Sequence, residues 1–160
     1  MFEQKIEVFI EEVLSEEAQK NALDFAEYLR TKELTFERGK GYWEDKRYWM
    51  IKRSVAWHDE YICFILVNGF GSLMNKDEPK GWIIWFDDWS ADFPLDEKIK
   101  EIAWENVDLC GHCGGVCDGG VTKKIFGKEF DNVCRTTFRF DNPNAEVVDC
   151  MKKMIDSMLD

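Results

Sequence analysis

The residues of this sequence whose types and spacing could support chemistry are four cysteines in one region. Cys110 and Cys113 are separated by two residues, Cys117 follows closely, and Cys134 stands further downstream. A Cys-x2-Cys pair lets two thiolates from one tight turn bind the same ion, and zinc takes four such ligands in a tetrahedron at about 2.3 Å. The sequence therefore predicts one structural zinc site formed by Cys110, Cys113, Cys117 and Cys134.

Glycines surround these cysteines and support a tight turn at the predicted metal site. Gly114 follows the second thiol directly, where a turn with unusual backbone angles and amides directed at sulfur is expected. His112 stands between Cys110 and Cys113 and is a spare nitrogen ligand, although a residue in that position usually points outward. A closed site of four thiolates has no open coordination position, so we expect it to stabilise the chain rather than to catalyse a reaction.

Three other interpretations of the same cysteines stay open. The stretch Cys110-Gly-His112-Cys113 matches the active-site motif of protein disulfide isomerases, which predicts thiol redox chemistry at Cys110 and Cys113. In that fold the first thiol begins a helix whose dipole lowers its pKa, whereas Gly114-Gly115 is poor material for starting one. The cysteines could also be inert thiols with Cys134 as a small core residue, or ligands of an iron–sulfur cluster, although the ferredoxin spacing is absent.

The composition narrows the class of protein and of partner. The formal net charge of -11 repels nucleic acids and anionic lipid surfaces, so neither is an expected partner. The N-terminal residues lack the features of a secretory signal, and no apolar run is long enough to span a membrane. The expected location is therefore the cytoplasm, where cysteines stay reduced unless they bind metal or act in redox chemistry. Cys63 and Cys150 fall outside the cysteine-rich region and are predicted to lie in the core.

The elements that must position the cysteines form a single domain over residues 1–160 of the α+β class. Helical periodicity predicts a helix over residues 2–14 and another over 95–104. Ser15 is the expected N-cap of a further helix, whose apolar stripe runs from Ala18 to Leu29, and a last helix follows Asn142-Pro143. Aromatic and β-branched runs predict strands at 34–38, 48–57, 61–67, 81–86 and 132–140. The expected fold is an antiparallel, largely sequential meander sheet packed against N- and C-terminal helices, with the Cys- and Gly-rich loop between the helix over 95–104 and the strand over 132–140.

Short breaks between the predicted strands set their pairing. Gly39-Lys40-Gly41 and His58-Asp59 are expected to be hairpin turns, so that neighbouring strands run antiparallel. Cys134 lies on the strand predicted over 132–140, which would bring it to the loop from an adjacent strand.

Tryptophans are concentrated in the same part of the chain as the predicted sheet. They are Trp43, Trp49, Trp57, Trp82, Trp85 and Trp89. Some of them must form the core, but a sheet with more aromatic surface than its helices cover would offer a face for a small planar ligand or for a protein partner. This binding-module hypothesis is independent of the cysteines.

The block from Trp104 to about Ile155 resembles a group of short, uncharacterised bacterial proteins of clostridial type. The likeness rests on the Cys-Gly-x-Cys-Gly loop, on the segment Ile125-Phe-Gly-Lys-Glu-Phe-Asp-Asn-Val-Cys134 and on the Asn142-Pro143 turn. The resemblance covers about a third of the chain and implies no activity. It implies that the loop and Cys134 belong to one unit, so our working expectation is a non-enzymatic protein with no catalytic residues and a structural zinc ion.

Overall fold

The computed structural model describes residues 5–14, 16–40, 47–55, 57–67, 81–87, 95–110 and 119–159, and of Val55, Asp87 and Arg135 the backbone alone. Its helices are α1 (Ile6–Val13), α2 (Glu16–Thr31), α3 (Glu97–Glu105) and α4 (Ala145–Leu159). Its strands are β1 (Thr35–Arg38), β2 (Tyr48–Val55), β3 (His58–Val67), β4 (Trp82–Asp87), β5 (Val107–Leu109), β6 (Val121–Ile125) and β7 (Lys128–Asp141). The predicted α+β class, with helices at both ends of an antiparallel sheet, is confirmed.

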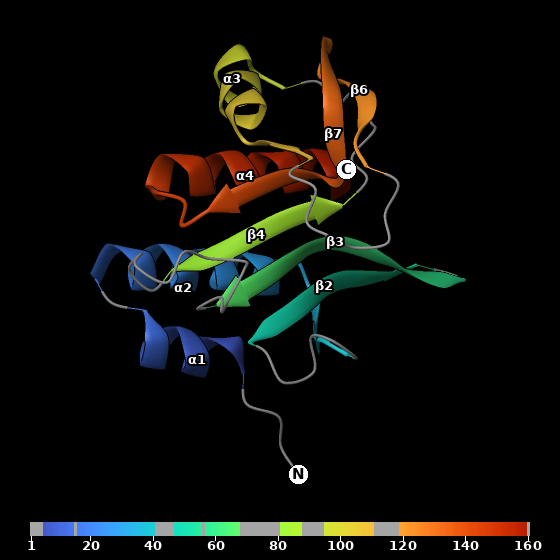
Figure 1. Cartoon of the computed structure of the whole chain (residues 1–160). Helices are drawn as coiled ribbons and strands as arrows, with labels where there is room; N and C mark the ends of the chain where they lie inside the picture. The colour runs from blue at the N-terminus through green and yellow to red at the C-terminus, as the bar shows by residue number, and fades with distance from the viewer. Residues whose placement is uncertain are drawn as a thin grey trace.

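The sheet is sequential through its first four strands and then changes order. Its path is β1-β2-β3-β4-β7-β5, with β6 pairing with β7 outside that path, and every pairing is antiparallel. The last strand in sequence therefore lies between β4 and β5. Figure 1 shows β7 continuing beyond the body of the sheet, where β6 lies beside it. This position makes β7 the strand that joins the meander to the cysteine region.

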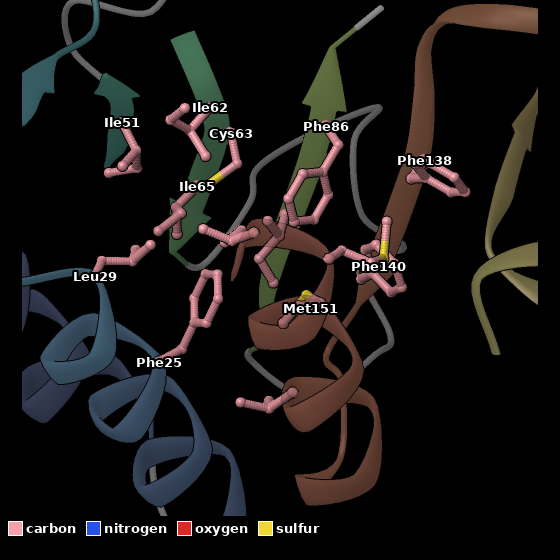
Figure 2. Packing of buried hydrophobic residues seen from close by; sticks show 14 of the residues in the cluster. Phe25, Leu29, Ile51, Ile62, Cys63, Ile65, Phe86, Phe138, Phe140 and Met151 are labelled. Carbon is pink, nitrogen blue, oxygen red and sulfur yellow. The ribbon is translucent and has the colours of Figure 1, made fainter. Parts of the chain in front are cut away.

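The main core lies between the sheet and the helices. Cys63 and Ile65 of β3 and Ile84 and Phe86 of β4 belong to one buried cluster with residues of α1, α2 and α4. Figure 2 shows Phe25 of α2 and Met151 of α4 among these sheet residues. The periodic apolar stripes of the sequence thus became the buried faces of the helices, as expected.

The alternate residues of the same strands point to the other face of the sheet, where they form a second apolar cluster. Tyr48, Leu66, Ile83 and Trp85 are buried in it. The strand register explains the separation, because Tyr48 is opposite Leu66 and Leu66 is opposite Ile83, whereas the neighbouring pairs contribute to the main core. The continuous apolar runs at β3 and β4 are therefore buried on both faces.

Two of the helices begin at a side chain that accepts a hydrogen bond from a backbone amide of the first turn. Asp96 caps α3 by accepting a hydrogen bond from the amide of Lys98 at 2.9 Å. Asn144 accepts one from the amide of Val147 at 2.9 Å, so α4 begins just after the predicted Asn142-Pro143 turn. Ser15, the predicted cap of the second helix, lies outside the described residues, as do residues 2–4 of the first predicted helix.

One predicted hairpin turn was misplaced. His58 and Asp59 are strand residues of β3, where His58 is opposite Val55 and Asp59 is opposite Ser54. Trp57, which was predicted to end the preceding strand, lies in the turn instead and is 92% exposed. Asp59 stays in the strand because its carboxylate binds Lys52 and the Ser54 hydroxyl across the pair, at 2.9 and 3.2 Å. For the break at Gly39-Lys40-Gly41, β1 and β2 pair antiparallel as predicted, and Gly41 lies outside the described residues.

The hairpin of β6 and β7 was missed in the sequence. Its two-residue turn is Phe126-Gly127, with φ of +47° and +86°, and Ile125 is opposite Lys128 across it. Positive φ at both central residues is the geometry of a type I′ turn, which matches the twist of an antiparallel pair. A phenylalanine in the first of these positions is not a usual turn signal, and this is why the segment 121–131 was not assigned to strands.

An ion pair between α1 and α2 gives the fold a testable dependence on pH. Arg30 donates to both carboxylate oxygens of Glu7, at 2.6 and 2.8 Å, and this bonding lowers the pKa of Glu7. Because the pKa of Glu7 is lower in the folded chain than in the unfolded chain, the ion pair contributes its full stabilisation of the fold at pH values above the unfolded-state pKa. This contribution is lost as the pH falls through the folded-state pKa of Glu7. We expect Glu7→Gln to lower the unfolding free energy by less than about 1 kcal/mol at pH 7, because the pair is partly exposed.

Urea unfolding at pH 7 and near pH 3 checks this prediction. The difference between the native chain and Glu7→Gln should shrink at the lower pH. Glu11→Gln is the matched control, because Glu11 is exposed on the same helix and its carboxylate has no ion pair among the described residues. A difference that stays constant between the two pH values would contradict the assignment.

Candidate functional site

Strands β5 and β7 place Cys110 and Cys134 in the same part of the sheet. Leu109 is opposite Val133, and the amide of Cys110 donates to the carbonyl oxygen of Asn132 at 2.8 Å. The Asn132 side-chain amide donates in return to the Cys110 carbonyl at 3.3 Å. Cys110 thus directly follows β5, the strand beside the one that carries Cys134, and both cysteines are half-buried. Two of the four predicted zinc ligands are therefore close in the fold although distant in the sequence.

The chain on either side of residues 111–118 is anchored to β7. Residues 111–118, which include His112, Cys113 and Cys117, lie outside the described residues. The chain on one side of this segment pairs with β7 through Leu109 and Cys110, and the chain on the other side pairs with it through Val121, which is opposite Val133. At Val133, the residue before Cys134, β7 therefore has β5 on one side and β6 on the other.

Gly120 marks how closely the returning chain approaches β7. A Cβ atom built on Gly120 would lie 2.5 Å from the carbonyl carbon of Asn132 and 2.7 Å from its Cα. Both distances are far below ordinary van der Waals contact, so only glycine fits at this position. Asn132 is consequently contacted from both sides, by Cys110 through hydrogen bonds and by Gly120 through close packing.

A polar cluster that the sequence did not indicate surrounds Cys134. The Thr136 hydroxyl donates to a carboxylate oxygen of Asp108 at 2.9 Å and lies 3.4 Å from the sulfur of Cys134. Burial raises the pKa of Asp108 above its usual range, and this effect is only partly offset by the hydrogen bond from Thr136. An aspartate between two apolar residues of a three-residue strand belongs to no recognisable motif, and for this reason it was missed.

The described residues contain no complete metal centre. Among them, no group of three or more His, Cys, Asp or Glu side chains is arranged to hold an ion. Two of the four predicted ligands, Cys110 and Cys134, are described, and the other two are in the 111–118 segment.

The remaining described cysteines are core residues, as predicted. Cys63 of β3 and Cys150 of α4 are fully buried. Burial raises the pKa of the Cys63 thiol far above its usual range and that of Cys150 to about 12, so both stay protonated. The Cys150 sulfur lies 3.6 Å from the carbonyl oxygen of Ile99. These two thiols are unsuited to metal binding and serve as controls for experiments on the other four.

The tryptophans of the sheet that the structure describes do not form one aromatic face. Trp49 and Trp82 belong to the main core, Trp85 is buried in the cluster on the opposite face, and Trp57 is exposed in the hairpin turn. Trp43 and Trp89 lie outside the described residues. Since the described tryptophans of the sheet are buried on its two faces, the predicted binding of a planar ligand to an open aromatic face gains no support from them.

Comparisons with protein-family models, with curated proteins and with solved structures found no match for this chain. The resemblance to the bacterial group therefore stays a prediction. Of the helices in the described part of the chain, none is both long and apolar enough to cross a membrane.

Proposed function

We propose that Cys110, Cys113, Cys117 and Cys134 bind one structural zinc ion that fastens the 111–118 segment to β7. The observation that supports it is the pairing of both flanks of this segment with β7 at residues 132–133, next to Cys134. An extended chain advances about 3.5 Å per residue, so a segment of this length with both ends beside Cys134 has ample reach to bring Cys113 and Cys117 to it.

The surroundings of Cys134 suit a thiolate ligand. The Thr136 hydroxyl lies 3.4 Å from its sulfur and donates its one proton to Asp108 in this structure; on metal binding it would turn that proton to the thiolate, which is a common second contact of metal-bound thiolates. Strand pairing fixes Cys110 through two hydrogen bonds to Asn132. With Cys110 and Cys134 held in place, the short segment between β5 and β6 has to supply only the other two ligands, Cys113 and Cys117. Four protein ligands leave no coordination position open for a substrate, and this favours a stabilising site over a catalytic one.

The alternative of thiol redox chemistry at Cys110 and Cys113 has less support. A redox-active first cysteine is usually activated by free amides at the start of a helix. Cys110 instead follows strand β5, and its own amide is already bonded to the Asn132 carbonyl.

Elemental analysis of untagged protein purified without chelator tests the proposal. We expect about one zinc per chain, because four thiolates complete one tetrahedral site. Cys134→Ser and Cys110→Ser should each lose most of this zinc, and cobalt added to the native sequence after its zinc has been removed should give the d–d absorption of a tetrahedral thiolate site.

The control is Cys150→Ala, which removes a thiol buried in the main core and should retain the metal while losing stability. Metal-free native protein in which Cys110 reacts rapidly with alkylating agents near neutral pH would overturn the zinc proposal and favour redox chemistry. Equal zinc content in the native chain and in both loop variants would also exclude the proposed ligand set.

A further inference from the structure

Asn132 of β7 lies at an irregularity of the sheet beside the cysteine region. Val121 of β6 is opposite Val133 of β7, and Lys123 is opposite Phe130. Between these pairs β7 has two residues where β6 has one, which makes a β-bulge that bends the strand and redirects its side chains. The φ of Asn132 is +59°, in the left-handed region that asparagine enters more readily than most residues. The bulge therefore depends on the type of residue at position 132.

Asn132 fixes the backbone of Cys110 on both sides of its Cα atom. The carbonyl oxygen of Asn132 accepts a hydrogen bond from the Cys110 amide at 2.8 Å, and its side-chain amide donates one to the Cys110 carbonyl oxygen at 3.3 Å. Each peptide group is planar, so holding the two that flank the Cα also holds the direction in which the Cβ atom leaves the backbone. The thiol of Cys110 is then left with the rotation of its own side chain.

The oxygen end of the Asn132 side chain faces the chain that returns to β7. A Cβ atom built on Gly120 would lie 2.5 Å from the Asn132 Oδ1, so this oxygen lies against Gly120 while the nitrogen of the same amide bonds Cys110. One side chain therefore contacts the chain on both sides of residues 111–118. Cys134 follows two positions later on the same strand, just after Val133, where β7 pairs with both β5 and β6.

We propose that Asn132 is a positioning residue for the metal site, which holds Cys110 in place beside β7 before the metal binds and in this way raises the affinity for zinc. The inference rests on the proposed set of four thiolates and adds a residue that binds no metal itself. A ligand that is already ordered loses less conformational entropy on binding. Replacing residues that orient metal ligands commonly weakens metal binding about tenfold to hundredfold. Because Asn132 is exposed, we expect the lower end of this range.

Competition for zinc with a chromophoric chelator, on the full chain under reducing conditions, measures this affinity. Asn132→Ala should bind zinc about tenfold more weakly than the native chain, because it lacks the amide and disfavours the left-handed φ. Asn132→Gly keeps access to that φ and lacks the amide alone, so it should bind about threefold more weakly. In the zinc-free protein, hydrogen exchange at the Cys110 amide should be slow in the native chain and about tenfold faster in Asn132→Ala.

Two controls separate the site from the fold. Thr122→Val removes a side-chain hydrogen bond across the same pair of strands, that of the Thr122 hydroxyl to Asp131 at 3.1 Å, and Cys150→Ala destabilises the main core. Both should bind zinc within about a factor of two of the native chain. Native zinc affinity in both Asn132→Ala and Asn132→Gly would overturn the inference alone, and so would a Cys110 amide that exchanges freely in the zinc-free native chain. A native chain that binds no zinc would overturn the proposed function and this inference with it.

Discussion

Replacing Phe140 by alanine should lower the free energy of unfolding by about 3–5 kcal/mol. Phe140 is fully buried on β7, and its ring centre lies 5.6 Å from that of Phe86 and 6.2 Å from that of Phe138. The rings of Phe140 and Phe86 meet edge to face at 83°. Removing the ring takes away its transfer free energy and leaves a cavity between the sheet and the helices, which rigid neighbours close only in part.

Urea unfolding followed by circular dichroism measures this loss. Trp57→Ala is the control, since it removes a larger side chain from a position that is 92% exposed, and it should change the unfolding free energy by no more than about 0.5 kcal/mol. A Phe140→Ala protein within about 1 kcal/mol of the native chain would mean that the central ring cluster is not packed as described.

Replacing Gly120 by alanine should cost about 1–3 kcal/mol, although it adds a single methyl group. The new Cβ would lie 2.5 Å from the backbone of Asn132. Asn132 cannot withdraw easily, because Cys110 is hydrogen-bonded to it on its other side. Either β6 must leave its register with β7 or the pairing of β5 with β7 must distort.

The same unfolding measurement applies to Gly120→Ala, and hydrogen exchange at the Cys110 amide reports the second possibility, since that amide is bonded to Asn132. Lys124→Ala is the control, because Lys124 is exposed on β6, the strand that follows Gly120, and is opposite Glu129 rather than Asn132. Native stability together with native protection of the Cys110 amide in Gly120→Ala would refute the close contact.

The sequence predicted the elements that carry a strong period and missed those that do not. The stripes of α2 and α4 and the apolar runs of β3 and β4 were recognised because burial of one face or of both leaves a pattern in the residues themselves. Strand β5 has three residues, too few for any pattern. Strand β6 has a buried residue only at its end, Ile125, and leads into a turn that begins with phenylalanine.

The sequence indicated candidate ligands for a metal site, but it did not indicate the residues that surround Cys134. Cysteine spacing is local information, so the grouping of Cys110, Cys113 and Cys117 needed no fold. The contact of Thr136 with Asp108 depends on a register between β5 and β7 that is irregular between Val107 and Leu109. Such a register is set by packing and not by any short motif.

The insertion of β7 between β4 and β5 has a consequence for the synthesis of the chain. Strand β4 reads Trp82-Ile-Ile-Trp-Phe86, an uncharged run of high β propensity, and one of its two edges is covered only by β7. While β7 is still being made, that edge presents free backbone groups of the kind that recruit other strands. The nascent chain therefore passes through a stage prone to aggregation, which ends when the residues around Phe138 and Phe140 dock onto β4.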